Sequence, residues 1–129
     1  MHGIGKDEGM LLKELYERGP RLYPGKCGII DGVRRFTYRE AGERHARLAS
    51  ALRELGLRRH ERLGLLLKNS AELIEAHAAG ARLGVAVGGV NYRLSLEGMK
   101  QTLLGLRCRV LVLDREFAER IDSIRSELP

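Results

Sequence analysis

Three short apolar segments, separated by two helical segments, constrain the fold of this chain more than any other feature. They cover residues 63–67, 85–90 and 109–113. Apolar and polar residues do not alternate within them, a pattern typical of strands that are buried on both faces of a sheet. Each pair is separated by a helix of crossover length, so we expect parallel strands with right-handed connections. The sequence therefore predicts an α/β fold.

Helix-capping residues mark the segments that follow the strands. Ser70 precedes a helix that Gly84 ends, and Ser95 precedes a helix that ends near Leu104. Asp114 is expected to cap a last helix. The apolar stripe of that helix contains Phe117, Ile121, Ile124 and Leu128. The second half of the chain is thus predicted to be a three-stranded parallel βαβαβα unit.

A sheet of three parallel strands leaves two open edges. Backbone groups at such edges have no partner and favour the addition of a further strand. No Pro-, Gly- or Ser-rich linker separates a second domain. We therefore interpret the chain as one domain or a piece of one, whose open edges can bind the remainder of a larger sheet or another chain.

The N-terminal segment is predicted to be a leader helix outside the core. The helix is expected to begin at Asp7 and to end at Gly19-Pro20, because proline cannot continue a helix. We assign residues 1–24 to this leader. Residues 25–129 then form the remaining, compact part of the chain.

A hairpin and a strongly signalled helix follow the leader. Residues 29–38 form two short apolar runs around Asp31-Gly32, which we interpret as turn residues. Thr37 and Glu40 have the spacing of a capping box, in which each side chain satisfies a backbone N–H of the helix start. The apolar stripe of the helix and the glycine that ends it are Ala41, His45, Leu48, Ala49, Leu52, Leu55 and Gly56.

Residues that could carry chemistry do not form a site by their spacing. The nearest candidate for a phosphate-binding loop is the Gly-Ile-Gly-Lys segment at residues 3–6, but no strand precedes it and no Ser or Thr follows. Cys27 and Cys108 have no second ligand nearby and are interpreted as packing residues. The four histidines lack the spacing of a metal-binding helix. We predict no catalytic, cofactor-binding or metal-binding residue.

Two further features have a structural interpretation beside a functional one. His77 is expected on the inner stripe of its helix together with Ile74, which favours a core or boundary role. Gly88-Gly89 ends a buried strand, where open α/β sheets bind ligands. Close backbone packing explains these two glycines equally well.

The charge of the chain does not by itself indicate a partner. The net charge is +6, from 23 basic and 17 acidic residues. Aromatic residues for base stacking are scarce and Trp is absent, so no nucleic acid is expected. No apolar segment approaches the ~20 residues of a transmembrane helix, and no secretory signal is recognised. We therefore expect a cytoplasmic protein.

Several short motifs follow one another in a fixed order between Phe36 and Asp114. They are Phe36-Thr37-Tyr38-Arg39-Glu40, Leu48-Ala49 with Leu52 and Gly56, Arg62 with Asn69-Ser70, Ala81-Arg82-Leu83-Gly84, Asn91-Tyr92-Arg93-Leu94, and Arg109-Val110-Leu111 with Asp114. In this order the chain resembles the N-terminal part of AMP-forming acyl-CoA synthetases, members of the adenylate-forming (AMP-binding) superfamily. The motif at residues 91–94 is most similar to fatty-acyl and related carboxylate–CoA ligases.

This resemblance implies a function for the intact family and a limit for the chain. Members of the family activate a carboxylic acid with ATP and Mg²⁺ to an acyl-adenylate, and CoA then displaces AMP to form a thioester. The family's glycine-rich ATP loop and its catalytic residues have no match in this sequence, so no functional residue is transferred to it. We expect an incomplete piece of the large domain that acts alone as a non-catalytic scaffold. The alternative is a stand-alone protein-interaction module derived from that domain.

The departures from the family pattern lie in turns and helix ends. His60-Glu61 replaces a Gly-Asp turn, and Cys27 and Gly89 stand where prolines are usual. The segment at residues 105–107 replaces a polar helix end. Such changes loosen turns and do not remove chemistry.

Overall fold

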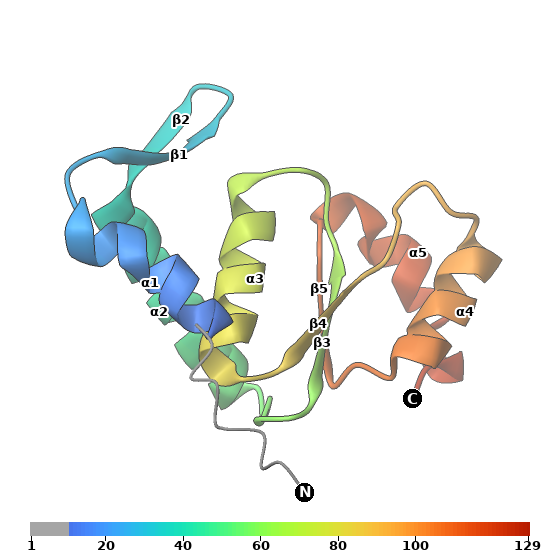
Figure 1. Cartoon of the computed structure of the whole chain (residues 1–129). Helices are drawn as coiled ribbons and strands as arrows, with labels where there is room; N and C mark the ends of the chain where they lie inside the picture. Colours follow the sequence, from blue (N-terminus) through green and yellow to red (C-terminus); the bar gives the residue numbers. More distant parts are fainter. Residues whose placement is uncertain (1–10) are drawn as a thin grey trace, which may run out of the picture.

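The computed structural model describes residues 11–129, which form two small sheets and five α-helices (Figure 1). In chain order the elements are α1 (Leu12–Leu22), β1 (Cys27–Asp31), β2 (Arg34–Thr37), α2 (Tyr38–Glu54), β3 (Arg62–Leu66), α3 (Ala71–Leu83), β4 (Ala86–Gly89), α4 (Leu96–Leu106), β5 (Val110–Leu113) and α5 (Ala118–Asp122). Two 3₁₀ turns, η1 (Arg115–Phe117) and η2 (Arg125–Glu127), flank α5.

The second half of the chain is the predicted α/β unit. Its three strands are parallel and ordered β4-β3-β5, so β3 is central and β4 and β5 form the edges. Figure 1 shows α3 on one face of this sheet and α4 with α5 on the other. The fold class and the parallel pairing are therefore confirmed. The strands differ from the predicted segments by at most one residue at each end.

The central strand β3 is apolar from Leu63 to Leu66, and its two covered faces explain why. Leu63 and Leu65 pack with side chains of α2 and α3, whereas Leu66 packs with side chains of α4 and α5. Successive side chains of a strand point to opposite faces, so both faces need apolar residues. Burial of each such side chain stabilises the fold by about 1.5–3 kcal/mol. Gly64 lies on the second face, where a Cβ would come within 2.7 Å of the Cys108 sulfur.

The predicted caps of the two crossover helices are present. The hydroxyl of Ser70 accepts the N–H of Leu73, and the hydroxyl of Ser95 accepts the N–H of Gly98. Gly84 ends α3 with a φ of +68°, a left-handed conformation that disfavours residues with a Cβ. The α4 helix continues two residues beyond its predicted end.

The predicted hairpin pairs β1 with β2 in antiparallel register. Asp31 pairs with Arg34, so the two loop residues are Gly32 and Val33 and the turn lies one residue later than predicted. Gly32 has a φ of +59°, the positive angle that a two-residue hairpin loop requires at its first position.

The capping box of α2 is confirmed. The N–H of Glu40 is donated to the Thr37 hydroxyl, and the Thr37 N–H is donated to the Glu40 carboxylate. Gly56 follows the helix with a φ of +95°. Leu55, predicted on the apolar stripe, is instead 68% exposed and is the C-cap residue that follows the last helical residue, Glu54.

The first helix differs from the prediction at its C-terminal end. It continues through Pro20 to Leu22, because proline costs only one backbone hydrogen bond near the end of a helix. The predicted start at Asp7 lies outside the described residues. No residue of α1 is buried, which agrees with its interpretation as an addition to the core.

The predicted single C-terminal helix is wrong. Residues 115–127 are divided into η1, α5 and η2, and Asp114 makes no side-chain cap to them. The Asp114 carboxylate instead accepts the N–H of Lys68 at 2.7 Å. The apolar stripe still reaches the core, since Phe117, Ile121 and Ile124 are buried. Among the described residues, no helix is long and apolar enough to cross a membrane.

Candidate functional site

The carboxyl edge of the parallel sheet is where an α/β fold would place a ligand. Here the loops after β3 and β5 bind each other. Lys68, which follows β3, contacts Glu116 with its ammonium at 2.7 Å, in addition to its backbone bond to Asp114. The hydrogen bond that the Lys68 ammonium donates to Glu116 raises the pKa of Lys68, so the ammonium remains charged.

Aromatic rings complete this edge. Tyr92, from the loop after β4, stacks on Phe117 with centroids 6.0 Å apart and an interplanar angle of 24°. The Lys68 ammonium lies 5.8 Å from each ring centroid, within the range of a cation–π contact. All three loops at the carboxyl ends of the strands are therefore joined through Lys68, which already has a carboxylate partner.

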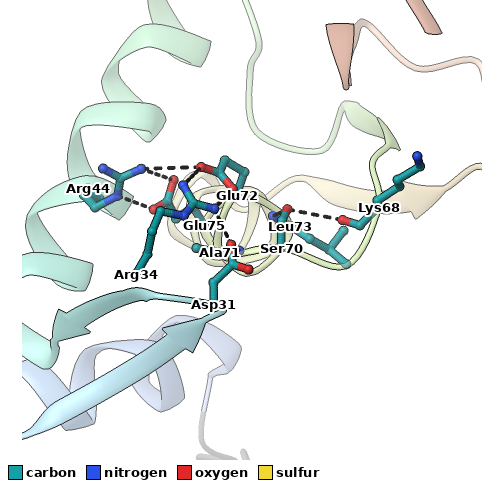
Figure 2. Close-up of polar contacts among 9 residues, drawn as sticks. All are labelled: Asp31, Arg34, Arg44, Lys68, Ser70, Ala71, Glu72, Leu73 and Glu75. Carbon is teal, nitrogen blue, oxygen red and sulfur yellow. Dashed lines mark hydrogen bonds and ion pairs between the residues drawn. The ribbon is translucent and has the colours of Figure 1, made fainter. Parts of the chain in front are cut away.

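A second polar cluster joins the hairpin to α2 and α3, and we name it the hairpin clasp. Its members are Asp31, Arg34, Arg44, Glu72 and Glu75. Figure 2 shows Arg34 and Arg44 converging on the two glutamates at the start of α3. Arg34 binds Glu72 at 2.6 Å and also binds Asp31, while Arg44 forms a fork on Glu75.

Burial and charge differ across the clasp. Glu75 is only 6% exposed, and Arg44 is its partner. Glu72 is partly exposed, and its hydrogen bond from Arg34 lowers the pKa of Glu72 to about 2. Each of these carboxylates is paired with an arginine, an arrangement that holds elements together and leaves neither free as a general base.

Asp31 has a larger role than the turn residue that the sequence predicts. Its carboxylate accepts the N–H of Ala71, the first residue of α3, at 3.0 Å (Figure 2). That bond and Arg34 lower the pKa of Asp31. Asp31 and Ser70 thus cap the same helix from two distant segments. No sequence signal marks this cap, because the residues it joins are 40 positions apart.

His45 is buried where α1, α2 and α3 meet. It is 7% exposed, and burial lowers the pKa of its imidazole. This burial confirms the place of His45 on the predicted apolar stripe of the helix. His77 is half-buried, as predicted, but Ile74 is exposed and does not belong to the inner face of α3. The buried face of that helix consists mainly of alanines, which a search for large apolar residues does not detect.

The two cysteines and the two glycines of β4 are structurally distinct. Cys108 packs against the α4–α5 face of the sheet, as predicted, whereas Cys27 is exposed, so its interpretation as a packing residue is wrong. A Cβ on Gly88 would overlap Leu106, which confirms close packing there, but Gly89 has open space around it.

Two kinds of site remain to be considered, a phosphate-binding loop and a metal site. The candidate loop, the Gly-Ile-Gly-Lys segment at residues 3–6, lies outside the described residues. Within residues 11–129, no group of three His, Cys, Asp or Glu side chains could hold a metal ion. We assign no residue of this part of the chain to Mg²⁺, ATP or CoA.

Known proteins similar to this chain share both its sequence and its fold. A butyrate–CoA ligase of Arabidopsis thaliana, described as peroxisomal, is 28% identical over 88% of this chain and 20% of the relative. An indoleacetate–CoA ligase of Aromatoleum aromaticum is 33% identical over 92% of this chain and 23% of the relative. The solved structure of an anthranilate–CoA ligase in complex with anthranoyl-AMP superposes with a TM-score of 0.86 at 31% identity, covering 91% of this chain and 23% of that one.

The chain spans about a fifth of the length of the curated relatives that it matches. The family model described as AMP-binding enzyme matches residues 16–129, which include every strand of the structure. The match begins within α1, in the segment that we assigned to the leader. This chain belongs to the AMP-binding enzyme family.

Proposed function

We propose that this chain supplies the N-terminal part of the large domain of an AMP-forming acyl-CoA ligase. The observation that carries the proposal is the joint match of sequence and fold to such ligases, over nearly the whole chain but only a small share of theirs. In the intact family, a carboxylic acid reacts with ATP to form acyl-AMP, and CoA then forms the thioester. The acyl substrate of this chain is not assigned.

The contribution of the chain to that reaction is that of a scaffold. Its described polar clusters are neutralised ion pairs that fix loops and helices, and its parallel sheet is packed on both faces. A scaffold of this kind holds the carboxyl edge of the sheet in place through Lys68 and Asp114. ATP, Mg²⁺ and CoA would be bound by residues outside this part of the chain.

The test is a chimera with a homologous ligase. Residues 16–129 would replace the matched segment of the indoleacetate–CoA ligase, and acid-dependent ATP–pyrophosphate exchange would be measured. We expect activity in the chimera, none in the relative that lacks its own N-terminal segment, and none in this chain alone. An inactive but folded chimera would contradict the scaffold function, and exchange by the chain alone would show that it is itself an enzyme.

A second function, a stand-alone interaction module, is favoured by the edges of the parallel sheet. Within the described residues, β4 and β5 each pair with β3 on one side only. Another chain, such as a separately encoded remainder of a ligase, could add a strand at either edge. Light scattering of the purified chain, alone and mixed with the remainder of a homologous ligase, distinguishes the two functions, because only a module binds a partner without covalent linkage.

Two further proposals concern the cellular compartment of the chain and its binding of nucleic acid. We propose a cytoplasmic protein that does not bind nucleic acid, since the arginines are dispersed and aromatic residues are few. Cell fractionation tests the compartment. Binding to duplex DNA that weakens steeply as salt is raised would contradict the second part of the proposal.

A further inference from the structure

His45 occupies an unusual position for an ionisable residue. Among the described residues, its Nε2 is the one buried side-chain nitrogen or oxygen atom without a hydrogen-bond partner. Its ring meets Tyr16 of α1 edge-on, with centroids 6.2 Å apart and an interplanar angle of 84°. A buried imidazole with an unpaired nitrogen is tolerated when neutral but is costly when charged. Tyr16 therefore covers a group whose charge state affects packing.

The helix that covers His45 is weakly attached. No residue of α1 is buried. Gly19 packs against the Tyr38 ring and Pro20 lies against Gly42, so the C-terminal half of α1 is in close contact with α2. The N-terminal half has Tyr16 on His45 and an ion pair of Glu17 with Arg82 at 3.8 Å, whose side chains are about half exposed. Such exposed pairs add at most about 1 kcal/mol.

The charges around His45 do not favour its protonation. Glu75 of α3 would stabilise the imidazolium, but its carboxylate is already bound by Arg44. Arg82 of α3 and Arg44 of α2 oppose a further positive charge. The other charged residues that line the groove between α1 and α2 are Lys13, Glu14, Glu17, Arg18, Arg21, Arg39 and Glu43. Four of these seven are cations, and Glu17 is paired with Arg82, so the groove has no net negative charge that would stabilise the imidazolium.

We propose that His45 makes the docking of α1 dependent on pH. The imidazole stays neutral while Tyr16 covers it, and it takes up a proton when α1 leaves and water reaches the ring. The sign follows from linkage, because the released state binds more protons than the docked state. Docking is therefore complete above pH 6.5, the ordinary pKa of histidine, and weakens as pH falls below that value.

Release of α1 has a defined structural consequence. The helix forms one wall of a groove of about 1000 Å³, whose floor includes Gly42 and Ala46 of α2 and Ala78 of α3. An isolated helix of this length is marginal in water, so released α1 should also lose its backbone hydrogen bonds. The device would thus expose the small-residue surface of α2 and α3 in mildly acidic conditions while the parallel sheet remains folded.

Amide hydrogen exchange of the full chain tests this coupling. Exchange would be followed by mass spectrometry at pH 7.5 and 5.0, after correction for the intrinsic rate. We expect faster exchange of α1 at pH 5.0, by a factor that cannot exceed about 30 for one histidine, while β3 is unchanged. His45→Phe keeps an aromatic contact with Tyr16 and cannot be protonated, so its α1 should exchange equally at both pH values. His77→Gln, a matched control on α3, should keep the wild-type response.

Two results would overturn the proposal. One is equal corrected exchange of α1 at both pH values in the wild-type chain, and the other is a parallel loss of protection in α1 and β3, which would indicate global unfolding. If His45→Phe does not fold, His45→Gln serves as the variant that cannot titrate. A reciprocal measurement uses NMR titration of His45, because Tyr16→Ala should raise the pKa of His45 toward that of free histidine. An unchanged pKa in that variant would also contradict the coupling.

Discussion

The parallel sheet and the hairpin are joined to the same helices by different forces. In the sheet, Leu63 is fully buried, and the strand that carries it is apolar and buried from Leu63 to Leu66. In the hairpin, Ile30 is 61% exposed, and a clasp of arginines and carboxylates joins the hairpin to α2 and α3 beside a small apolar cluster of Ile29, Phe36, Ala41 and Ala71. Apolar burial is non-directional, whereas a clasp requires particular atoms to meet. The sheet should therefore respond to lost volume and the hairpin to lost charge.

Removal of volume from the central strand should have the largest effect. Leu63→Ala removes buried methyl groups and leaves a cavity between the sheet and α3, so we expect a loss of about 2–5 kcal/mol in the free energy of unfolding. Urea denaturation followed by circular dichroism measures it. Ile30→Ala in β1 is the control, with an expected change of about 0.5 kcal/mol or less. Equal losses in the two variants would contradict the division between the two regions.

Removal of charge from the clasp should have an intermediate effect. Glu75→Ala leaves the Arg44 guanidinium without its buried partner, although Arg44 can rehydrate because a third of its side chain is exposed. We expect a loss of roughly 1–3 kcal/mol in the free energy of unfolding. Glu119→Ala on α5, which has no ion pair among the described contacts, should change stability by about 0.5 kcal/mol or less. An unchanged stability in Glu75→Ala would show that the contact between α2 and α3 does not depend on this ion pair.

The exposed part of the clasp should respond to acid. Glu72 has a folded-state pKa of about 2, lowered by Arg34, against an ordinary value of 4.5. The stability that this pair contributes is present above pH 4.5 and is lost as pH falls toward 2. Arg34→Met should reduce the slope of stability against pH in this window, while Arg35→Met, on the opposite side of β2, should leave it unchanged. Because Glu72 is well exposed, the effect should be smaller than that of Glu75→Ala.

The difference between local contacts and contacts between distant segments explains which features can be predicted from the sequence. Ser70, Thr37 and Gly84 act on backbone groups within four residues of themselves, so their roles follow from local spacing. The strands follow from the continuous apolar segments that two-sided burial requires. By contrast, the two arginine–glutamate pairs of the clasp join residues that are 31 and 38 positions apart in the sequence, so they leave no periodic signal.

The incorrect predictions have a related cause. Asp114 stands where a helix cap is expected, yet it binds Lys68, a residue 46 positions away that the fold brings close. Pro20 was expected to end a helix, but only one lost hydrogen bond opposes its continuation, and contact with Gly42 favours it. In both cases a tertiary contact outweighs a local preference.

A substitution in the turn before β3 should give the smallest change in the free energy of unfolding. Unlike the preceding variants, it should stabilise the chain. His60 has a φ of +69°, the left-handed conformation that costs a residue with a Cβ about 1–2 kcal/mol. Because glycine adopts this conformation without that cost, His60→Gly should stabilise the chain by about 0.5–1 kcal/mol, once the greater freedom of glycine in the unfolded state is subtracted. Arg59→Gly, at a neighbour without a positive φ, should instead reduce stability by about 0.5–1 kcal/mol. Thermal and urea unfolding of both variants would show whether each substitution raises or lowers the free energy of unfolding. If both lower stability equally, the strain at His60 is compensated by contacts of its side chain, and the turn belongs with the clasp as a feature that tertiary structure, rather than local sequence, determines.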